Sequence, residues 1–399
     1  MIVEIRGVNF RNKGAELMLH AVLQQARAPE GEPIRFALHE RGGTEAQRRS
    51  LGLDTVRWKS ASRLPLAAAV HNRLPGWMPE GMRRARRLVA PEEIDVVLDA
   101  SGFAYGDPWG ARKSEVPADY YEGLKRRGTR IVLLPQQLGP FADAEVRRHF
   151  ARILDLADLV FARDPISLDN ARAIAPEAPI RQAPDFTPGV EGRVPGYFAQ
   201  VERAACLVPN QQMVAKGSPE ASGAYRGFLA TAAREMLELG LNLHLLIHDD
   251  SPGDVVLAEG VCADLGIDVP IIREPDPLVV KGILSRCHVT VGSRFHGLVS
   301  ALSYGVPSLG TGWSHKYRML FEDFGCPACL VDPAWPAERI RERIRAIAGG
   351  NERERVIEGL RLGRERYLGE TERMWSAVNG VIAEAAGTGA PAAVGGHDR

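Results

Sequence analysis

The feature that most constrains the fold is a pair of strand-to-helix turns between residues 289 and 325. The letters CHVTV predict a short buried strand, the next residues predict a turn, and residues 296 to 304 predict a helix with apolar residues at helical spacing. Gly305 ends that helix, VPSLG predicts the next parallel strand, and a second turn leads to a helix over residues 315 to 324. Strands that alternate with helices in this way predict an α/β fold with parallel sheets.

Basic side chains occur at the start of both predicted helices. Arg294 and His296 lie at the first helix start, directly after Ser293, and Lys316 lies at the second. In a parallel sheet, ligands bind outside the carboxyl ends of the strands, where helix N-termini offer free N–H groups and positive potential to anions. The two turns therefore predict an anion pocket. Because the same helix start disfavours a protonated imidazole, His296 is expected in its neutral form, suited to taking a proton or donating one hydrogen bond.

Chain length and charge narrow the classes of protein to consider. A chain of 399 residues exceeds the usual limit of one hydrophobic core, so two domains are expected. The 50 Lys and Arg residues balance the 50 Asp and Glu residues, so no global field would attract nucleic acid. No apolar run is long enough to cross a bilayer, and the first residues, MIVEIRGVNFRNKG, lack the apolar core of a signal peptide. A cytoplasmic protein is expected.

The five cysteines do not have the spacing of a disulfide framework. Cys326 and Cys329 have the spacing of a redox pair or of half a zinc site, but the sequence contains no second pair of this kind. Two ordinary buried thiols are the preferred interpretation. The sequence also lacks a Walker loop, a Gly-x-Ser-x-Gly elbow and a metal-ligand cluster.

Candidate ligand-binding residues in the first half follow the predicted strands. The turn after the first strand is rich in Gly and Asn, and it is equally suited to holding a substrate and to capping the following helix. Later loops present hydroxyl and amide groups that could bind a sugar. Arg163 also follows a strand, where it is either an anion ligand or the partner of a carboxylate, and its position at the carboxyl end favours the ligand. The candidates for binding an acceptor sugar are Asn9, Asn12, Ser101, Tyr105, Asp107 and Gln136.

The stretch APDFTPGVEGRVPGYFAQ contains many Pro and Gly residues and has no periodicity, which predicts a domain linker. The predicted domains are therefore 1–190 and 191–385, followed by a disordered tail over 386–399. A second alternating series begins after the linker, and Asn210 and His248 each follow one of its strands. Both are expected at the binding edge of the second sheet, although a single histidine after a strand is more often structural.

Segment 57–89 combines eight Arg and Lys residues with Trp58 and Trp77. Aromatic residues among arginines are suited to contact with an anionic membrane face or a lipid diphosphate. A solvated basic helix is the preferred interpretation, because three prolines interrupt the stretch. Peripheral contact with the inner face of a membrane is the alternative.

Several motifs together resemble those of the polysaccharide pyruvyl transferase family. They are NKGAELML near the start, LPQQLGPF and ARDPIS in the first half, LLIHDD in the second half, and GSRFHGLVSALSYGVP followed by His315 and Lys316. Each motif is short, but their order and spacing over residues 2–331 make the resemblance specific. It implies two Rossmann-like domains that face each other across a cleft, as in GT-B glycosyltransferases. It also implies that the pyruvyl unit of phosphoenolpyruvate is transferred to two hydroxyls of one sugar, forming a cyclic ketal, during exopolysaccharide or other cell-surface glycan assembly.

The chemistry implied by this resemblance assigns roles to the candidate residues. His296 is expected to exchange protons with the methylene carbon of phosphoenolpyruvate and with the sugar hydroxyls, while Arg294 and Lys316 stabilise the departing phosphate. The donor side is expected to include Arg163, Ser293, Asn210 and His248. These cations and the imidazole are expected to converge on phosphoenolpyruvate between the two halves. The reaction requires no cofactor and does not demand a metal.

One loop departs from the family pattern. Many family members have consecutive glycines after the strand that corresponds to IDVVLD, whereas this chain has DASGF at residues 99 to 103. That loop is expected to contact the acceptor. The acceptor is therefore left open, as a sugar, a nucleotide sugar or a lipid-linked glycan.

Two other functions fit the same fold. A GT-B glycosyltransferase would use a nucleotide sugar, but the second half shows no clear pair of glutamates spaced to bind a ribose and a donor sugar. A non-catalytic scaffold would only bind a glycan or an assembly partner. The presence of both His296 and Lys316 argues against the scaffold, because a decayed site tends to lose its charged residues.

Overall fold

The computed structural model describes the chain except for residues 31, 59–71, 73–75, 250 and 389–399. The chain forms two compact units that are not consecutive halves of the sequence. Unit 1 consists of Met1–Phe10, Val22–Asp185 and Glu372–Arg399, and unit 2 consists of Arg11–Ala21 and Phe186–Thr371.

Unit 1 contains a sheet in which eight strands of the described chain pair in parallel, in the order β4-β3-β2-β1-β5-β6-β7-β8. The central strands are almost entirely apolar and buried, as expected for a parallel sheet covered by helices on both faces. The strands are β1 (Ile2–Arg6), β2 (Arg35–His39), β3 (Asp54–Val56), β4 (Leu88–Val89), β5 (Val96–Asp99), β6 (Arg130–Gln136), β7 (Leu159–Ala162) and β8 (Ile180–Gln182).

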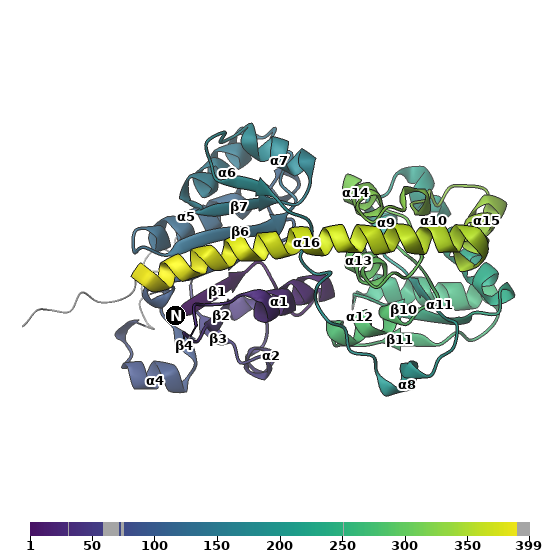
Figure 1. Cartoon of the computed structure of the whole chain (residues 1–399), viewed down its shortest axis with the longest axis horizontal. Helices are drawn as coiled ribbons and strands as arrows, with labels where there is room; N and C mark the ends of the chain where they lie inside the picture. The colour runs from purple at the N-terminus through teal and green to yellow at the C-terminus, as the bar shows by residue number, and fades with distance from the viewer. Residues whose placement is uncertain (31, 59–71, 73–75, 250, 389–399) are drawn as a thin grey trace, which may run out of the picture. The chain divides into compact units, whose positions relative to one another are not determined.

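Helices pack against this sheet by the residues that their sequences predict. In α6 (Ala144–Leu156), Val146, Phe150 and Ile153 recur at helical spacing and are fully buried, while Asp143 caps the first turn by accepting hydrogen bonds from two backbone N–H groups. Figure 1 shows α6 with α5 and α7 beside β6 and β7. The other α-helices that the structure describes in this unit are α2 (Glu45–Ser50), α4 (Glu80–Ala85), α5 (Arg112–Lys125) and α7 (Pro165–Arg172).

Unit 2 contains a second parallel sheet, in which five strands of the described chain pair in the order β11-β10-β9-β12-β13. Its strands are β9 (Ala204–Val208), β10 (Asn242–Ile247), β11 (Ile271–Arg273), β12 (Val289–Gly292) and β13 (Ser308–Gly310). The helices are α8 (Gly196–Ala199), α9 (Gln212–Lys216), α10 (Pro219–Glu238), α11 (Pro252–Leu265), α12 (Pro277–Ser285), α13 (Phe295–Ser303), α14 (His315–Asp323) and α15 (Ala337–Ala348). The predicted turns from β12 to α13 and from β13 to α14 are confirmed within one residue.

The strand order reverses once in each sheet. In unit 1, β1 pairs with both β2 and β5, and in unit 2, β9 pairs with both β10 and β12. At such a reversal the loops that leave the two adjacent strands diverge, and this opens the crevice in which α/β proteins bind ligands. The candidate sites are therefore expected after β1 and β5 in unit 1, and after β9 and β12 in unit 2.

Two helices contribute residues to both units. The predicted linear division of the chain into 1–190 and 191–385 does not include such shared helices. They are α1 (Lys13–Gln25) and the long yellow helix α16 (Gly350–Thr388) in Figure 1. The boundary between Asp185 and Phe186 falls inside the Pro-rich and Gly-rich stretch. Residues 386 to 388 belong to α16, and the rest of the tail that was predicted to be disordered lies outside the described residues.

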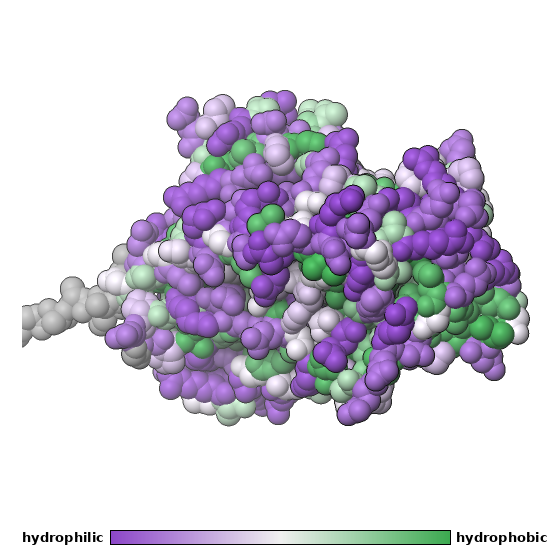
Figure 2. All heavy atoms as spheres, turned by 45° about the vertical axis from the view of Figure 1, so that its right-hand side comes forward, coloured by the Kyte–Doolittle hydropathy of each residue, from purple (hydrophilic) through white to green (hydrophobic). Residues whose placement is uncertain are grey.

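The described residues also allow statements about the surface and about the cysteines. Hydrophilic residues cover most of the face drawn in Figure 2, with apolar residues showing in separate groups. No described helix is both long enough and apolar enough to span a bilayer. Cys326 and Cys329 are buried free thiols, as predicted. Segment 57–89, predicted as a solvated basic helix with membrane contact as the alternative, lies partly outside the described residues.

Candidate active site

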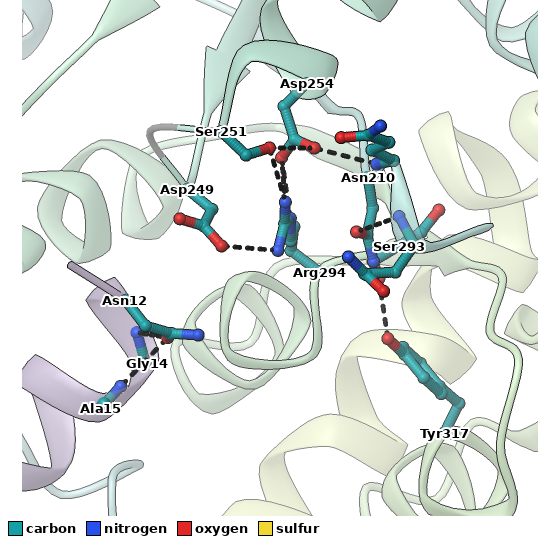
Figure 3. A network of polar contacts seen from close by, with 12 residues as sticks. Asn12, Gly14, Ala15, Asn210, Asp249, Ser251, Asp254, Ser293, Arg294 and Tyr317 are labelled. Carbon is teal, nitrogen blue, oxygen red and sulfur yellow. Dashed lines mark hydrogen bonds and ion pairs between the residues drawn. The ribbon is translucent and has the colours of Figure 1, made fainter. Parts of the chain in front are cut away.

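At the strand reversal of unit 2, the turns after β9 and β12 are bonded to each other. The side-chain Nδ2 of Asn210 donates to the carbonyl oxygen of Ser293 at 2.7 Å, and the hydroxyl of Tyr317 donates to the same oxygen at 2.9 Å (Figure 3). The hydroxyl of Tyr225 lies 2.8 Å from Ser293 Oγ. Ser293 is fully buried and Asn210 nearly so. The two residues, predicted as donor ligands, thus hold the turn that begins α13.

Arg294, the N-cap residue of α13, forms ion pairs with two carboxylates. Its Nη1 donates to Asp249 at 2.9 Å and its Nε donates to Asp254 at 2.8 Å (Figure 3). Asp254 is completely buried, and its other oxygen accepts hydrogen bonds from the backbone N–H of Gln211 and the hydroxyl of Ser251. A guanidinium between two carboxylates is not a free anion ligand. These contacts hold the guanidinium of Arg294 beside the start of α13.

His296 follows in the first turn of α13 and packs against the first turn of α1. A Cβ atom on Gly14 would stand 2.1 Å from the imidazole Nδ1, so only glycine allows this approach. Asn12 caps α1 by accepting hydrogen bonds from the backbone N–H groups of Gly14 and Ala15 at 2.9 and 3.2 Å (Figure 3). The predicted acceptor ligand Asn12 is thus a helix cap that places Gly14 against His296.

His248 follows β10 and is a second imidazole at this edge of the sheet. Its side chain is buried, and its Nε2 has no hydrogen-bond partner among the described residues. Burial lowers the pKa of His248 well below its ordinary value of 6.5, and the nearby positive charges of Arg294, His296 and Lys13 lower it further. His248 is therefore neutral at physiological pH and has an unused hydrogen-bonding nitrogen.

Lys316, in the first turn of α14, lies among aromatic rings. Its Nζ is 5.1 Å from the ring centroid of Phe295, 5.2 Å from that of Trp313 and 5.5 Å from that of Tyr317. The face of Trp313 also holds Lys216 Nζ at 4.8 Å. Ring faces are negative, so they hold an ammonium group in place without neutralising it. Lys316 therefore brings a positive charge to the start of α14.

Arg163 belongs to unit 1, whereas the other predicted donor ligands belong to unit 2. It follows β7, its backbone N–H donates to the carbonyl of Gln136, and its Nη1 lies 3.6 Å from Asp185 Oδ2. Both side chains of this ion pair are buried. Arg163 was predicted to be either an anion ligand or the partner of a carboxylate, and the structure shows a carboxylate partner. The predicted convergence of Arg163 with Arg294, Lys316 and His296 stays a prediction.

At the strand reversal of unit 1, the predicted acceptor residues meet around Asp99, the last residue of β5. Its carboxylate accepts hydrogen bonds from the hydroxyls of Ser101, Tyr105 and Tyr121, with the tyrosine bonds at 2.5 and 2.6 Å. Tyr105 is buried, so its hydroxyl is committed to the core and not presented to a sugar. A Cβ on Gly7 would strike Ser101, which shows how closely the loops after β1 and β5 approach.

The remaining acceptor candidates lie in different environments. Asp107 accepts hydrogen bonds from the backbone N–H groups of Ala142 and Asp143 at 2.8 and 3.1 Å, so it joins two loops. Gln136 ends β6 fully buried, and neither its side-chain oxygen nor its nitrogen has a partner among the described residues. Asn9 lies after β1 in unit 1 and is partly buried. Of the unit 1 candidates, Gln136 has the strongest structural reason to meet a ligand.

The contacts of four residues of this site were not predicted from the sequence. Lys13 and Gly14 belong to the early motif NKGAEL, and Asp249 and Asp254 belong to the loop and helix start after LLIHDD. The motifs were noted, but their pairing with Arg294 and His296 depends on contacts between distant parts of the chain. Among the described residues, no three His, Cys, Asp or Glu side chains are grouped to hold a metal ion.

Solved structures with similar folds support the class of the architecture. The Anabaena protein HepE in complex with UDP-glucose has 12% identity and a TM-score of 0.58, with 97% of this chain and 99% of that chain covered. S. aureus MnaA with UDP has 12% identity and a TM-score of 0.57, with 94% and 95% covered. A Rickettsia africae glycosyltransferase has 11% identity and a TM-score of 0.55, with 96% and 98% covered. The chain therefore has a GT-B-like fold with two Rossmann-like domains, as predicted.

The family follows from a sequence model that covers most of the chain. The model of the polysaccharide pyruvyl transferase family matches residues 12–315. This range includes the early motif with Lys13 and Gly14, the loop with His248, and the turn with Arg294 and His296. The chain belongs to the polysaccharide pyruvyl transferase family, which confirms the resemblance.

Proposed function

We propose that this protein transfers the pyruvyl group of phosphoenolpyruvate to two hydroxyls of a sugar acceptor and so forms a cyclic ketal in the synthesis of a polysaccharide or cell-surface glycan. The observation that carries the proposal is the set of basic groups at the strand reversal of unit 2. Lys13 comes from the start of α1, whereas Arg294 and His296 come from the start of α13, and all three are close enough to act electrostatically on His248. The family membership supports the same class of reaction.

Phosphoenolpyruvate carries a carboxylate and a phosphate, so its site must supply positive charge and N–H donors. Arg294 is engaged by Asp249 and Asp254, and we assign it to holding the first turn of α13. The anion is then bound by the positive end of that helix and by the charges of Lys13 and Lys316. His248, neutral and with an unused nitrogen, contributes a hydrogen bond without adding charge.

His296 is the residue that we assign to proton exchange. One sugar hydroxyl adds to C2 of phosphoenolpyruvate, loses its proton to the imidazole, and the methylene carbon receives a proton to become a methyl group. Cleavage of the bond between C2 and the phosphate oxygen releases inorganic phosphate, and the second hydroxyl adds to C2 with loss of its own proton. Lys316 and Lys13 stabilise the charge on the leaving phosphate. The atoms balance as phosphoenolpyruvate plus a diol giving a ketal plus phosphate.

We assign the acceptor sugar to unit 1. Gln136 is buried at the end of β6, and its amide can both donate to and accept from a hydroxyl. Ser101 lies at the strand reversal of the same sheet. The acceptor class is a sugar, free or carried on a nucleotide or lipid. No metal and no cofactor takes part in the proposed steps.

The test is release of phosphate from phosphoenolpyruvate across a panel of sugar acceptors, with the ketal methyl group detected by NMR. The His296→Ala variant should lose ketal formation and keep its circular dichroism spectrum. His244→Ala is the matched control, because His244 lies in the same unit, where its side chain bonds to the backbone of Asn242 and packs against the ring of Phe198. Tight binding of UDP or GDP without any binding of phosphoenolpyruvate would overturn the proposal in favour of a nucleotide-sugar glycosyltransferase.

A further inference from the structure

Unit 1 contains a cavity of about 370 Å³ lined mainly by arginine side chains. This volume is in the range of ligand pockets in proteins. The lining residues come from β3, from α2 and from the segments next to β2 and β4. The lining includes five guanidinium groups and only two carboxylates. The arginines are Arg48, Arg49, Arg57, Arg86 and Arg87, and the glutamates are Glu40 and Glu45.

Two of these arginines build the walls of the cavity. Arg48 is buried, and it donates hydrogen bonds to the carbonyls of Glu40 and Gly43 and to the hydroxyl of Thr55. Arg87 forms an ion pair with the buried Asp54 at 3.0 Å. Arg48 has no carboxylate partner in these bonds, although the charges of Glu45 and Glu40 lie close enough to act on it.

Of the other arginines, Arg49 pairs with Glu45 at 2.6 Å, whereas Arg57 and Arg86 have groups left for a ligand. Arg57 is bound to Glu40 through its Nε alone, at 3.1 Å. Arg86 is exposed, and its side chain has no hydrogen bond or ion pair with the described residues. Guanidinium forks match the oxygen pairs of a phosphate, and a cavity with excess positive charge stabilises such an anion.

We propose that this arginine cavity binds the phosphate or diphosphate group of a phosphorylated carrier to which the acceptor sugar is attached. The proposal rests on the proposed function, because it assigns the carrier of that sugar. The chemistry is shared by a lipid diphosphate and by a nucleotide diphosphate. In both cases the carrier phosphate is held in unit 1, which is the unit assigned to the acceptor.

The first experiment measures pyrophosphate binding to the full chain by calorimetry, and it needs no enzymatic turnover. The variant Arg57→Ala/Arg86→Ala should bind pyrophosphate about tenfold more weakly or worse, as expected for the loss of charge-assisted hydrogen bonds. Arg84→Ala is the matched control, because Arg84 is exposed in α4, pairs with Glu80 and does not line the cavity. Equal pyrophosphate affinity in the wild type and the double variant would overturn the proposal.

The second experiment separates the two carriers. Vesicles of phosphatidylcholine with and without phosphatidylglycerol are compared with a soluble UDP-sugar, each in competition with pyrophosphate. Vesicle binding that pyrophosphate displaces and the double variant lacks supports a lipid carrier, and the same pattern with the UDP-sugar supports a nucleotide carrier. If the double variant still bound both the vesicles and the UDP-sugar, the proposal would be overturned. A chain that binds pyrophosphate through this cavity but never consumes phosphoenolpyruvate would support the cavity and refute the proposed function.

Discussion

Gly14 and His296 lie in contact, so closely that a Cβ atom on the glycine would stand 2.1 Å from the imidazole Nδ1. The glycine is the second residue of α1, and the histidine is in the first turn of α13. The backbone of one helix start therefore forms the wall against which the proposed proton-exchanging group rests. A side chain at position 14 would displace the ring, because the two cannot share this space.

The first prediction is that Gly14→Ala lowers kcat while the protein stays folded. Alanine suits a helix better than glycine, so α1 itself should not be weakened, but the imidazole of His296 must move. We expect kcat to fall at least about tenfold, as for partial loss of a general acid or base. Gly123→Ala in α5 is the control, because a Cβ there meets no atom within 4 Å. An unchanged kcat in the Gly14 variant would remove His296 from the chemistry.

The second prediction compares two lysines that lie against the same tryptophan. Lys316→Ala should weaken phosphoenolpyruvate binding by about 1 to 3 kcal/mol, the effect of one lost charged hydrogen bond. Lys216→Ala should leave donor affinity unchanged, although Lys216 lies at 4.8 Å from the Trp313 ring centroid and Lys316 at 5.2 Å. Isothermal titration of phosphoenolpyruvate measures both. Equal losses in the two variants would mean that Trp313 packing, and not a ligand contact of Lys316, sets the affinity.

The third prediction tests whether Arg294 acts through its ion pairs. Arg294→Ala leaves the buried Asp254 without its partner, and we expect the free energy of unfolding to fall by about 3 to 5 kcal/mol. Asp254→Asn combined with Arg294→Ala should restore part of this loss, because the orphaned charge is gone. Urea denaturation measures the cycle. Arg226→Ala, which breaks an exposed pair with Asp264, should change stability little. Additive effects at Arg294 and Asp254 would contradict the positioning role.

The fourth prediction concerns pH and His248. Its folded-state pKa lies well below 6.5, so below that pH the unfolded chain binds a proton that the folded chain does not. Stability must then fall as the pH drops through about 6.5 toward the folded-state value. His248→Gln removes this group, so its unfolding free energy should decline less steeply between about pH 7 and pH 5. Thermal or urea unfolding across this range measures the slope. Parallel slopes for both proteins would show that His248 is not buried in its neutral form.

The positions of the strand ends and helix starts could be predicted because local rules determine them. A short apolar run followed by glycine or proline and then a helical repeat predicts where a parallel strand ends and a helix begins. This reasoning placed His296 and Lys316 at the starts of α13 and α14, as observed. The family motifs predicted the GT-B-like fold, which the structural relatives confirm.

The partners of these residues could not be predicted in the same way. Arg294 was expected to meet an anion, but its guanidinium is bound by Asp249 and Asp254. These carboxylates lie 45 and 40 residues earlier in the chain, which is beyond the reach of any rule for a helix turn. Tyr105 and Asp107 were expected to face a sugar. The hydroxyl of Tyr105 instead donates to the buried Asp99, and the carboxylate of Asp107 joins two loops. The charge and the hydrogen-bonding capacity of a side chain follow from its residue type. The partner that the side chain binds depends on how the chain packs.

By itself, the sequence determined the alternation of strands and helices, the residue types at the strand ends and the family, because these follow from neighbouring residues and their order. Only the tertiary structure decided that the first turn of α1 packs with unit 2, that Gly14 supports His296, and that two carboxylates engage Arg294. The reason is physical. Local propensity acts over one helical turn, while burial and ion pairing join side chains that only the folded chain brings within a few ångströms.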